Sequence, residues 1–316
     1  MEIVVTGGTG MVGKCIQNLV TKYPNNKFRF LSSKDCDLRD RSQVLEFFSN
    51  NTFNYIIHLA ANVGGLYKNM EKNITMFSDN IKINENVLEA CHKNNIKRGM
   101  FCLSSCIYPA EPSKFPMDET MIHESAPHPS NEGYAYSKRM LELQCRHYNQ
   151  TYNYNYICVV PVNLYGPYDN FNLQDSHFIP GLMHRFQKQI NLKNKSLPYN
   201  FNAFGTGTPL RQFLYAPDFA KLILLILFKY SGNTPIICCD DNEYTIKEMV
   251  HKVSDVMEIP TELLTWDTEK SDGCLKKTVT NKKLKMMFPE FKFTTVEKGL
   301  ENTYNWFNEN YDTLRK

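Results

Sequence analysis

The sequence lacks long hydrophobic runs. No segment approaches the roughly 18 consecutive apolar residues of a membrane-spanning helix, and no basic, then apolar, targeting segment opens the chain. A strong charge of either sign is also missing, because 36 Lys and Arg balance 33 Asp and Glu to a net charge of +3. That balance is too weak to favour nucleic acid as a partner. We therefore expect a soluble, cytoplasmic protein that binds neither membranes nor nucleic acids.

The ten cysteines lack the spacing of a zinc site, since none forms a C-x-x-C pair. A chain of 316 residues can bury a sizeable core and does not need disulfides for stability. Scattered thiols are typical of proteins in a reducing compartment. The pattern therefore predicts free cysteines and no structural metal.

Short apolar strands alternate with helical segments in the first half of the chain. We expect strands at 2–6, 28–31, 55–59, 99–103 and 156–160, with helices between them at 11–20, 42–48, 81–91 and 135–148. Such alternation implies parallel strands joined by right-handed crossovers, and hence an α/β fold with a Rossmann-type doubly wound sheet.

The composition and periodicity of the sequence change after the fifth expected strand. Residues 166–216 are rich in Asn, Pro, Gly and aromatic residues and show few long periodic segments. Helices are expected again near 219–230, 246–257 and 296–311, and a strand at 235–239. We therefore predict a Rossmann domain over residues 1–162 and a smaller substrate lobe over residues 163–316, with some segments returning to the sheet.

A glycine-rich turn follows the first expected strand directly and opens the first helix. Its residues are Gly7, Gly8, Thr9, Gly10, Met11, Val12 and Gly13. Glycines at this spacing allow a pyrophosphate to approach the backbone closely, and the helix N-terminus offers N–H groups and a positive dipole. The turn therefore predicts a dinucleotide cofactor, although glycines can also serve only to shape a tight turn.

The end of the second expected strand selects the cofactor. It carries Ser33 and Lys34 where an acidic residue would bind the ribose of NAD. A cation accommodates a 2′-phosphate instead, so the sequence favours NADP(H). The alternative is that Lys34 is an ordinary exposed loop lysine.

A serine, a tyrosine and a lysine form a candidate catalytic set. Tyr134 and Lys138 lie four residues apart and share one face of an expected helix. Lys138 can lower the pKa of the Tyr134 phenol and hold the cofactor ribose, while Tyr134 exchanges a proton with a carbonyl oxygen. Ser104 follows the fourth expected strand, at the sheet edge where doubly wound folds bind ligands, and can hydrogen-bond the same oxygen.

These motifs resemble the extended short-chain dehydrogenases/reductases over essentially the whole chain. Two further segments carry the likeness: His58-Leu59-Ala60-Ala61 and Pro161-Val162-Asn163-Leu164-Tyr165-Gly166-Pro167. The resemblance implies a homodimer formed by two helices of the nucleotide-binding domain. It also extends the expected cofactor contacts to Leu59, Ala60, Ala61, Lys138, Pro161, Val162, Asn163, Leu164 and His177.

A cysteine and a histidine narrow the resemblance. Cys106 stands two residues after Ser104, where the dehydratase branch carries carboxylates, and His177 lies in Ser176-His177-Phe178-Ile179-Pro180. With the segment 61–66, this is similar to the GDP-L-fucose synthases, which epimerise C3 and C5 of GDP-4-keto-6-deoxy-D-mannose and reduce C4. The resemblance implies that Cys106 and His177 move the protons during epimerisation.

The same resemblance implies a binding site for the GDP-sugar. Its expected members are Arg185, Phe204, Arg211 and Asp272. Arginine suits a diphosphate because its planar fork can bind two oxygens at once. Phe204 stands where the family often has tryptophan, so stacking is retained while the indole N–H is lost.

Other interpretations of these residues stay open at this point. Cys106 can be a small buried hydrophobe, and His177 a structural histidine. A nucleotide-sugar 4-epimerase with permanently bound NAD would use the same fold without Cys106. A Rossmann protein that only senses NADP(H) is a third possibility, but such a protein has no need of the Ser104, Tyr134 and Lys138 set.

Overall fold

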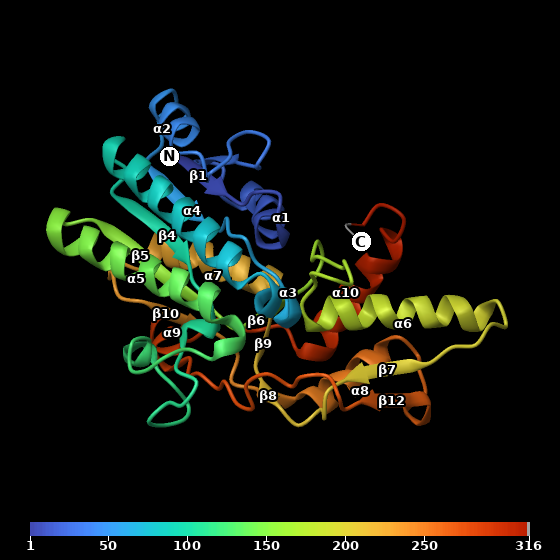
Figure 1. The fold of residues 1–316 in the computed structure, drawn as a ribbon. Helices are drawn as coiled ribbons and strands as arrows, with labels where there is room; N and C mark the ends of the chain where they lie inside the picture. The colour runs from blue at the N-terminus through green and yellow to red at the C-terminus, as the bar shows by residue number, and fades with distance from the viewer. Residues whose placement is uncertain (315–316) are drawn as a thin grey trace.

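The computed structural model describes residues 1–314 and is organised around one six-stranded sheet (Figure 1). Its order is β10-β5-β4-β3-β1-β2, and all neighbouring strands run parallel. The strands are β1 (Glu2–Thr6), β2 (Lys27–Phe30), β3 (Tyr55–His58), β4 (Arg98–Cys102), β5 (Asn155–Pro161) and β10 (Ile236–Cys238). The predicted doubly wound α/β fold is thereby confirmed.

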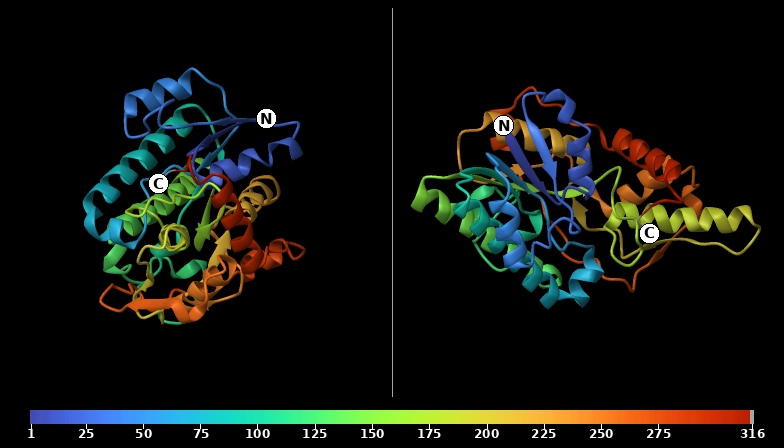
Figure 2. Two further views of the ribbon diagram at one scale, coloured as in Figure 1. Left: turned by 90° about the vertical axis from the view of Figure 1, so that its right-hand side faces the viewer. Right: turned by 90° about the horizontal axis from the view of Figure 1, so that it is seen from above.

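Helices cover both faces of this sheet, as the turned views in Figure 2 show. On one face α2 (Arg41–Ser49), α4 (Asn73–Lys93) and α5 (Glu132–Tyr152) pack side by side, and on the other α1 (Met11–Gln17) packs against α7 (Ala216–Lys229). A sheet covered on both faces needs strands that are apolar throughout rather than alternating. The central strand β1 meets this need, since Ile3, Val4 and Val5 are fully buried.

The strand order reverses between β3 and β1. A buried network of hydrogen bonds holds the ends of these two strands together at the reversal. The Thr6 hydroxyl accepts hydrogen bonds from the N–H groups of Leu59 (3.2 Å) and Ala60 (3.3 Å) and bonds Nδ1 of His58 at 2.8 Å. The other ring nitrogen of His58 contacts Asn84 at 3.2 Å. Burial lowers the pKa of His58 to about 3, so the ring is neutral. Ligands of doubly wound sheets bind at such a reversal.

The smaller lobe extends from one end of the sheet and contains the long helix α6 (Phe178–Asn194; Figure 1). Its other elements are β7 (Phe201–Phe204), β12 (Leu264–Asp267), α8 (Ile246–Val256) and α10 (Val296–Glu309). Short pairs join β8 (Leu210–Arg211) to β11 (Tyr244–Thr245) and β6 (Asn163–Tyr165) to β9 (Phe213–Tyr215). The remaining short helices are α3 (Leu66–Glu71) and α9 (Lys282–Met287).

Helix α6 corrects the expectation that residues 166–216 hold few long periodic segments. It spans Phe178–Asn194, a regular helix of 17 residues. Pro180 and Gly181 stand near its start and conceal its periodicity in the sequence. The proline is tolerated because the first-turn N–H groups of a helix have no partner within the helix.

Buried apolar side chains form two separate hydrophobic clusters within residues 1–314, and the division near residue 162 stays a prediction. One contains the sheet together with α7 and β10, and the other joins α6, α8 and α10 with β7. The segments 216–227 and 236–239 belong to the first cluster, so the second half of the chain contributes to both lobes. Within residues 1–314, no helix combines the length and apolar character needed to cross a membrane.

The glycine turn gives a test of this packing. A Cβ on Gly13 would lie 2.5 Å from the carbonyl oxygen of Gly7, whereas one on Gly10 would meet that oxygen at 3.3 Å. We expect Gly13→Ala to lower the free energy of unfolding by about 1–3 kcal/mol, because the backbone must shift to admit the methyl group. Gly10→Ala is the control and should change stability much less. Chemical denaturation without cofactor measures both, and equal losses would contradict this account of the turn.

Candidate functional site

The glycine turn is packed tightly against the ends of its neighbouring strands. Gly7 adopts a φ of +68°, and a Cβ there would lie 2.9 Å from the backbone nitrogen of Ala60. Gly13, where α1 crosses the turn, has no room for a side chain. Within the described chain no side chain caps the start of α1 at Gly10, so its first N–H groups are available to an anion. The geometry suits a pyrophosphate.

The loop after β2 keeps its cation accessible. Ser33 and Lys34 are both exposed there. Arg39, which the sequence analysis missed, donates from Nε and Nη2 to the Asp37 carboxylate at 3.0 and 2.8 Å. Because Asp37 is paired with Arg39, its charge is partly offset beside the position expected for a 2′-phosphate.

The segment after β5 lies beside the same edge. Pro161 ends β5, Val162 is buried, and β6 begins at Asn163 and continues through Leu164. The Asn163 amide donates to the carbonyl of Gln212 at 2.8 Å, which ties β6 to the residue directly before β9.

A serine and a thiol lie next to each other at the end of β4. The Ser104 hydroxyl accepts the N–H of Cys106 at 3.4 Å and caps the short turn η2 (Ser105–Ile107). Helix α5 packs on this turn and brings Tyr134 and Lys138 to it. The Lys138 ammonium donates to the carbonyl of Cys102 at 2.8 Å and lies 5.8 Å from the centre of the Tyr134 ring. We call Ser104, Cys106, Tyr134 and Lys138 the phenol–thiol cluster.

Burial decides the protonation of the phenol. It raises the pKa of Tyr134 well above the ordinary range, and the nearby Cys106 and Cys102 add to the rise. The net rise comes from burial and from the two thiols, and the expectation that Lys138 lowers the pKa of this phenol stays a prediction. Burial also lowers the pKa of Lys138. The phenol remains a proton donor.

The Cys106 thiol has a cationic neighbour that the sequence analysis missed. Burial raises the pKa of Cys106. Three neighbours lower this pKa: the charge of Lys277, then a hydrogen bond with Ser104, then the charge of Lys138. Lys277 also contributes, after burial, to the lowered pKa of His128. No motif marks Lys277, since it lies far from Cys106 in the chain and reaches it only through the fold.

His177 belongs to a second group of residues. It precedes α6, and its loop lies against the loop before α3, because the Gly65 N–H donates to the carbonyl of Asp175 at 3.0 Å. His177 is an exposed residue, yet the surrounding protein lowers its pKa, and the charge of Lys68 adds to the effect. Among residues 1–314, no hydrogen bond or ring contact joins His177 to Cys106.

Two of the expected substrate residues, Arg185 and Phe204, lie in the smaller lobe near α3. The guanidinium of Arg185, from α6, stands 3.9 Å from the ring centre of Phe204, and Tyr67 of α3 meets this ring edge-on at 6.4 Å. Burial lowers the pKa of Arg185 to about 10. Its Nε is buried and has no hydrogen-bond partner in the part of the chain that the structure describes. A cation left in this state is suited to an anionic ligand.

Arg211 and Asp272 flank this group. Arg211 donates to the carbonyls of Leu210 (2.8 Å) and Cys274, and burial lowers its pKa. Asp272 accepts the N–H and hydroxyl of Thr206 at 2.8 and 2.7 Å, so it holds the turn after β7. The structure therefore gives Asp272 a definite structural partner, while its charge acts on Arg211.

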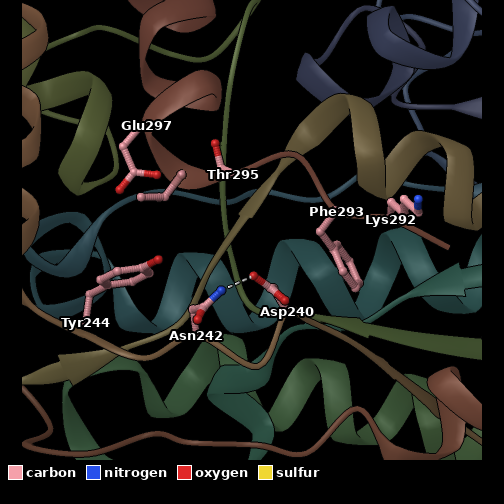
Figure 3. Close-up of a pocket in the computed structure, with 8 residues that line it drawn as sticks. Asp240, Asn242, Tyr244, Lys292, Phe293, Thr295 and Glu297 are labelled. Carbon is pink, nitrogen blue, oxygen red and sulfur yellow. Dashed lines mark hydrogen bonds between the residues drawn. The ribbon is translucent and has the colours of Figure 1, made fainter.

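The pocket drawn in Figure 3 lies elsewhere. Its volume is about 420 Å³, and its wall includes Asp240, Tyr244 and Glu297. Asn242 donates to Asp240 across its floor at 2.6 Å. None of the expected site residues lines it, so it is separate from the candidate site.

The chain is similar over its whole length to proteins of one family. Residues 3–237 match the NAD dependent epimerase/dehydratase family. A GDP-L-fucose synthase of Dictyostelium discoideum is 42% identical over 99% of this chain and 97% of its own, and a probable GDP-L-fucose synthase of Drosophila melanogaster is 39% identical over 100% and 99%. A crystal structure of a GDP-L-fucose synthetase from Naegleria fowleri bound to NADP is 38% identical, covers 100% of this chain and 96% of its own, and has a TM-score of 0.89. The chain belongs to the NAD dependent epimerase/dehydratase family and, within it, to the GDP-L-fucose synthases.

Proposed function

We propose that this protein converts GDP-4-keto-6-deoxy-D-mannose to GDP-L-fucose by epimerising C3 and C5 and then reducing C4 with NADPH. The observation that carries the proposal is the phenol–thiol cluster, in which one hydroxyl, one phenol and one thiol meet at the end of β4. Its relatives among the GDP-L-fucose synthases support the same choice of substrate.

The chain offers a binding site that fits NADP(H). The uncapped start of α1 and the crowded backbone at Gly13 suit the pyrophosphate, and the exposed Lys34 suits the 2′-phosphate. The segments 59–61 and 161–164 line the same edge of the sheet. When bound, the cofactor supplies the hydride for C4.

Epimerisation needs a place for the charge that forms on the substrate. The C4 carbonyl acidifies the protons on both neighbouring carbons, and the loss of either proton moves negative charge onto the C4 oxygen. The Ser104 hydroxyl and the Tyr134 phenol can hydrogen-bond this oxygen, and in a dry site such donors stabilise an oxyanion strongly. Return of a proton to the opposite face of the same carbon inverts it and leaves the proton count unchanged.

Cys106 and His177 are the proposed proton carriers. Burial raises the pKa of the thiol, and the surrounding protein and the Lys68 charge lower the pKa of the imidazole, so at rest the sulfur holds a proton and the ring is neutral. The pair therefore starts with one proton to donate and one nitrogen that can accept a proton. This is the protonation that removal and return of a proton require.

Reduction then uses the same oxygen site. A raised pKa keeps the Tyr134 phenol protonated, so Tyr134 can give its proton to the C4 oxygen as hydride reaches C4. One hydride and one proton convert the ketone to the alcohol. In this proposal Arg185 and Arg211 bind the diphosphate, Phe204 stacks on the nucleotide sugar, and Asp272 holds the adjoining turn.

We also propose a cytoplasmic homodimer. All ten cysteines are free, as expected for a protein in a reducing compartment. Helices α4 and α5 pack on each other along one face of the sheet, and this helix pair is the proposed dimer contact.

The activity itself is the first test. With GDP-4-keto-6-deoxy-D-mannose present, we expect loss of NADPH absorbance and formation of GDP-L-fucose, identified by chromatography and NMR. A 4-epimerase would interconvert a nucleotide sugar with no net cofactor turnover. No NADPH consumption with the keto-sugar would therefore rule the proposal out.

Cys106→Ser separates the two half-reactions. A hydroxyl is a far weaker acid than a thiol, so we expect epimerisation to fall by a factor on the order of 10²–10⁴. Reduction should persist, so that the product is the unepimerised sugar. Cys91→Ser, which alters another buried thiol remote from the cluster, is the control for stability. Formation of the L-sugar at the normal rate by Cys106→Ser would show that Cys106 is structural.

Tyr134→Phe removes the proton donor for reduction. We expect NADPH oxidation to fall by a factor on the order of 10²–10⁴, while thermal stability stays near that of the wild type. Tyr136→Phe is a matched control, because Tyr136 lies on the same helix and its ring contacts Arg139 rather than Lys138. Equal rates of NADPH oxidation in the two variants would remove Tyr134 from the mechanism.

A further inference from the structure

The loop that carries His177 is interlocked with the loop before α3. The Gly65 N–H donates to the carbonyl of Asp175, and a Cβ on Gly65 would lie 2.2 Å from the carbonyl oxygen of Ser176. A side chain at position 65 would therefore push the two loops apart. The contact places the residues before His177 directly against the chain that leaves β3.

Lys68 fastens the two loops together. Its side chain is only 13% exposed, and its ammonium donates to the carbonyl of Val63 at 3.1 Å and lies 3.6 Å from the Asp175 carboxylate. Its aliphatic stem fills the space beside Gly64, where a Cβ would come within 2.4 Å of the lysine Cδ. A long side chain held at both ends and along its stem has little freedom to move away.

Asn69 supports the same arrangement from the next position of α3. Its amide donates to the carbonyls of Gly64 (2.8 Å) and Gly65 (2.9 Å), and the residue is buried. The glycine loop is thus fixed independently of Lys68, so replacing Lys68 need not unfold it.

The ammonium also acts on His177 through its charge. A neighbouring cation disfavours the imidazolium and so lowers the pKa of His177, in the same direction as the partial loss of hydration next to the protein. In the described structure the charge that acts on His177 is that of Lys68, and Asp175, two residues before His177, lies within 3.6 Å of the Lys68 ammonium. Asp175 is about one-third exposed, so it offsets the lysine charge only in part.

We propose that Lys68 is a positioning residue for His177: it clamps the His177 loop to the glycine loop and sets its positive charge against that loop. The kinetic part of this inference rests on the proposed function. A neutral imidazole accepts a proton, and the imidazolium that results is destabilised by Lys68 and gives the proton back readily. The cation thus keeps the ring unprotonated before the reaction and favours release of the proton afterwards, while it makes the ring a weaker base.

An NMR titration of His177 tests the electrostatic part without any activity. The wild type, Lys68→Gln and Asp175→Asn are titrated as whole proteins without substrate, with His177→Gln used to assign the resonance. Loss of the cation should raise the pKa of His177, and loss of the carboxylate should lower it. A role limited to packing would not move the two variants in opposite directions. An unchanged pKa in Lys68→Gln would overturn the proposal.

Deuterium exchange at C3 and C5 of the keto-sugar tests the kinetic part. We expect Lys68→Gln to slow exchange about tenfold or more, because small displacements of a catalytic group are costly, while reduction of the unepimerised ketone continues. The acidic limb of the exchange rate should move to higher pH, since removing the cation raises the pKa of His177. Lys68→Arg keeps the charge and should restore exchange.

Lys72→Gln serves as the surface control, because Lys72 is an exposed lysine one turn away, and it should exchange like the wild type. Equal losses of exchange and reduction in Lys68→Gln would show general damage and would overturn the positioning role. A wild type that fails both reactions would instead reject the proposed function, and the titration would still decide what Lys68 does to His177.

Discussion

The ammonium of Lys138 is buried at the end of β4, where it donates a 2.8 Å hydrogen bond to the carbonyl of Cys102. Burying a cation without a carboxylate partner is costly, so the rest of the structure must hold it there. It does so through α5, which lies along the sheet and packs on the turn that begins at Ser104. The same contact carries Tyr134 to Cys106. The position of the phenol–thiol cluster therefore follows from one contact, the packing of α5 against the end of β4.

Burial at this point also sets the protonation of the reacting groups. The neighbours that act on the charge of Lys138 are thiols, with Cys102 and Cys106 the strongest of them. Because hydration is lost, the phenol and thiol hold their protons and the lysine gives up its proton more easily than in water. Protons can then be exchanged between side chains that carry little charge before the reaction begins. A buried carboxylate next to Lys138 would have stabilised the ammonium, and the lysine would then have kept its proton.

Local signals were enough to predict the sheet and the cluster from the sequence. Apolar strands such as 2–6, the glycine turn and the four-residue spacing of Tyr134 and Lys138 each have a physical meaning within a short stretch of chain. Helix α6 was missed because Pro180 and Gly181 interrupt its pattern at the start. Lys277 and Lys68 were missed for another reason: they act on Cys106 and His177 only after distant segments have met, and no spacing in the sequence marks them.

The two proposed proton carriers stand on different lobes, and this division has a consequence. Cys106 belongs to the hydrophobic cluster of the sheet, whereas His177 precedes α6, which is anchored in the other cluster. The lobe built around the sheet also carries Ser104, Tyr134 and Lys138. Reduction therefore depends on the geometry of one packed unit, while epimerisation depends on how two units are held together. Gly65 contacts Asp175, and Lys68 fastens this contact. Through it the two lobes can form a single rigid site.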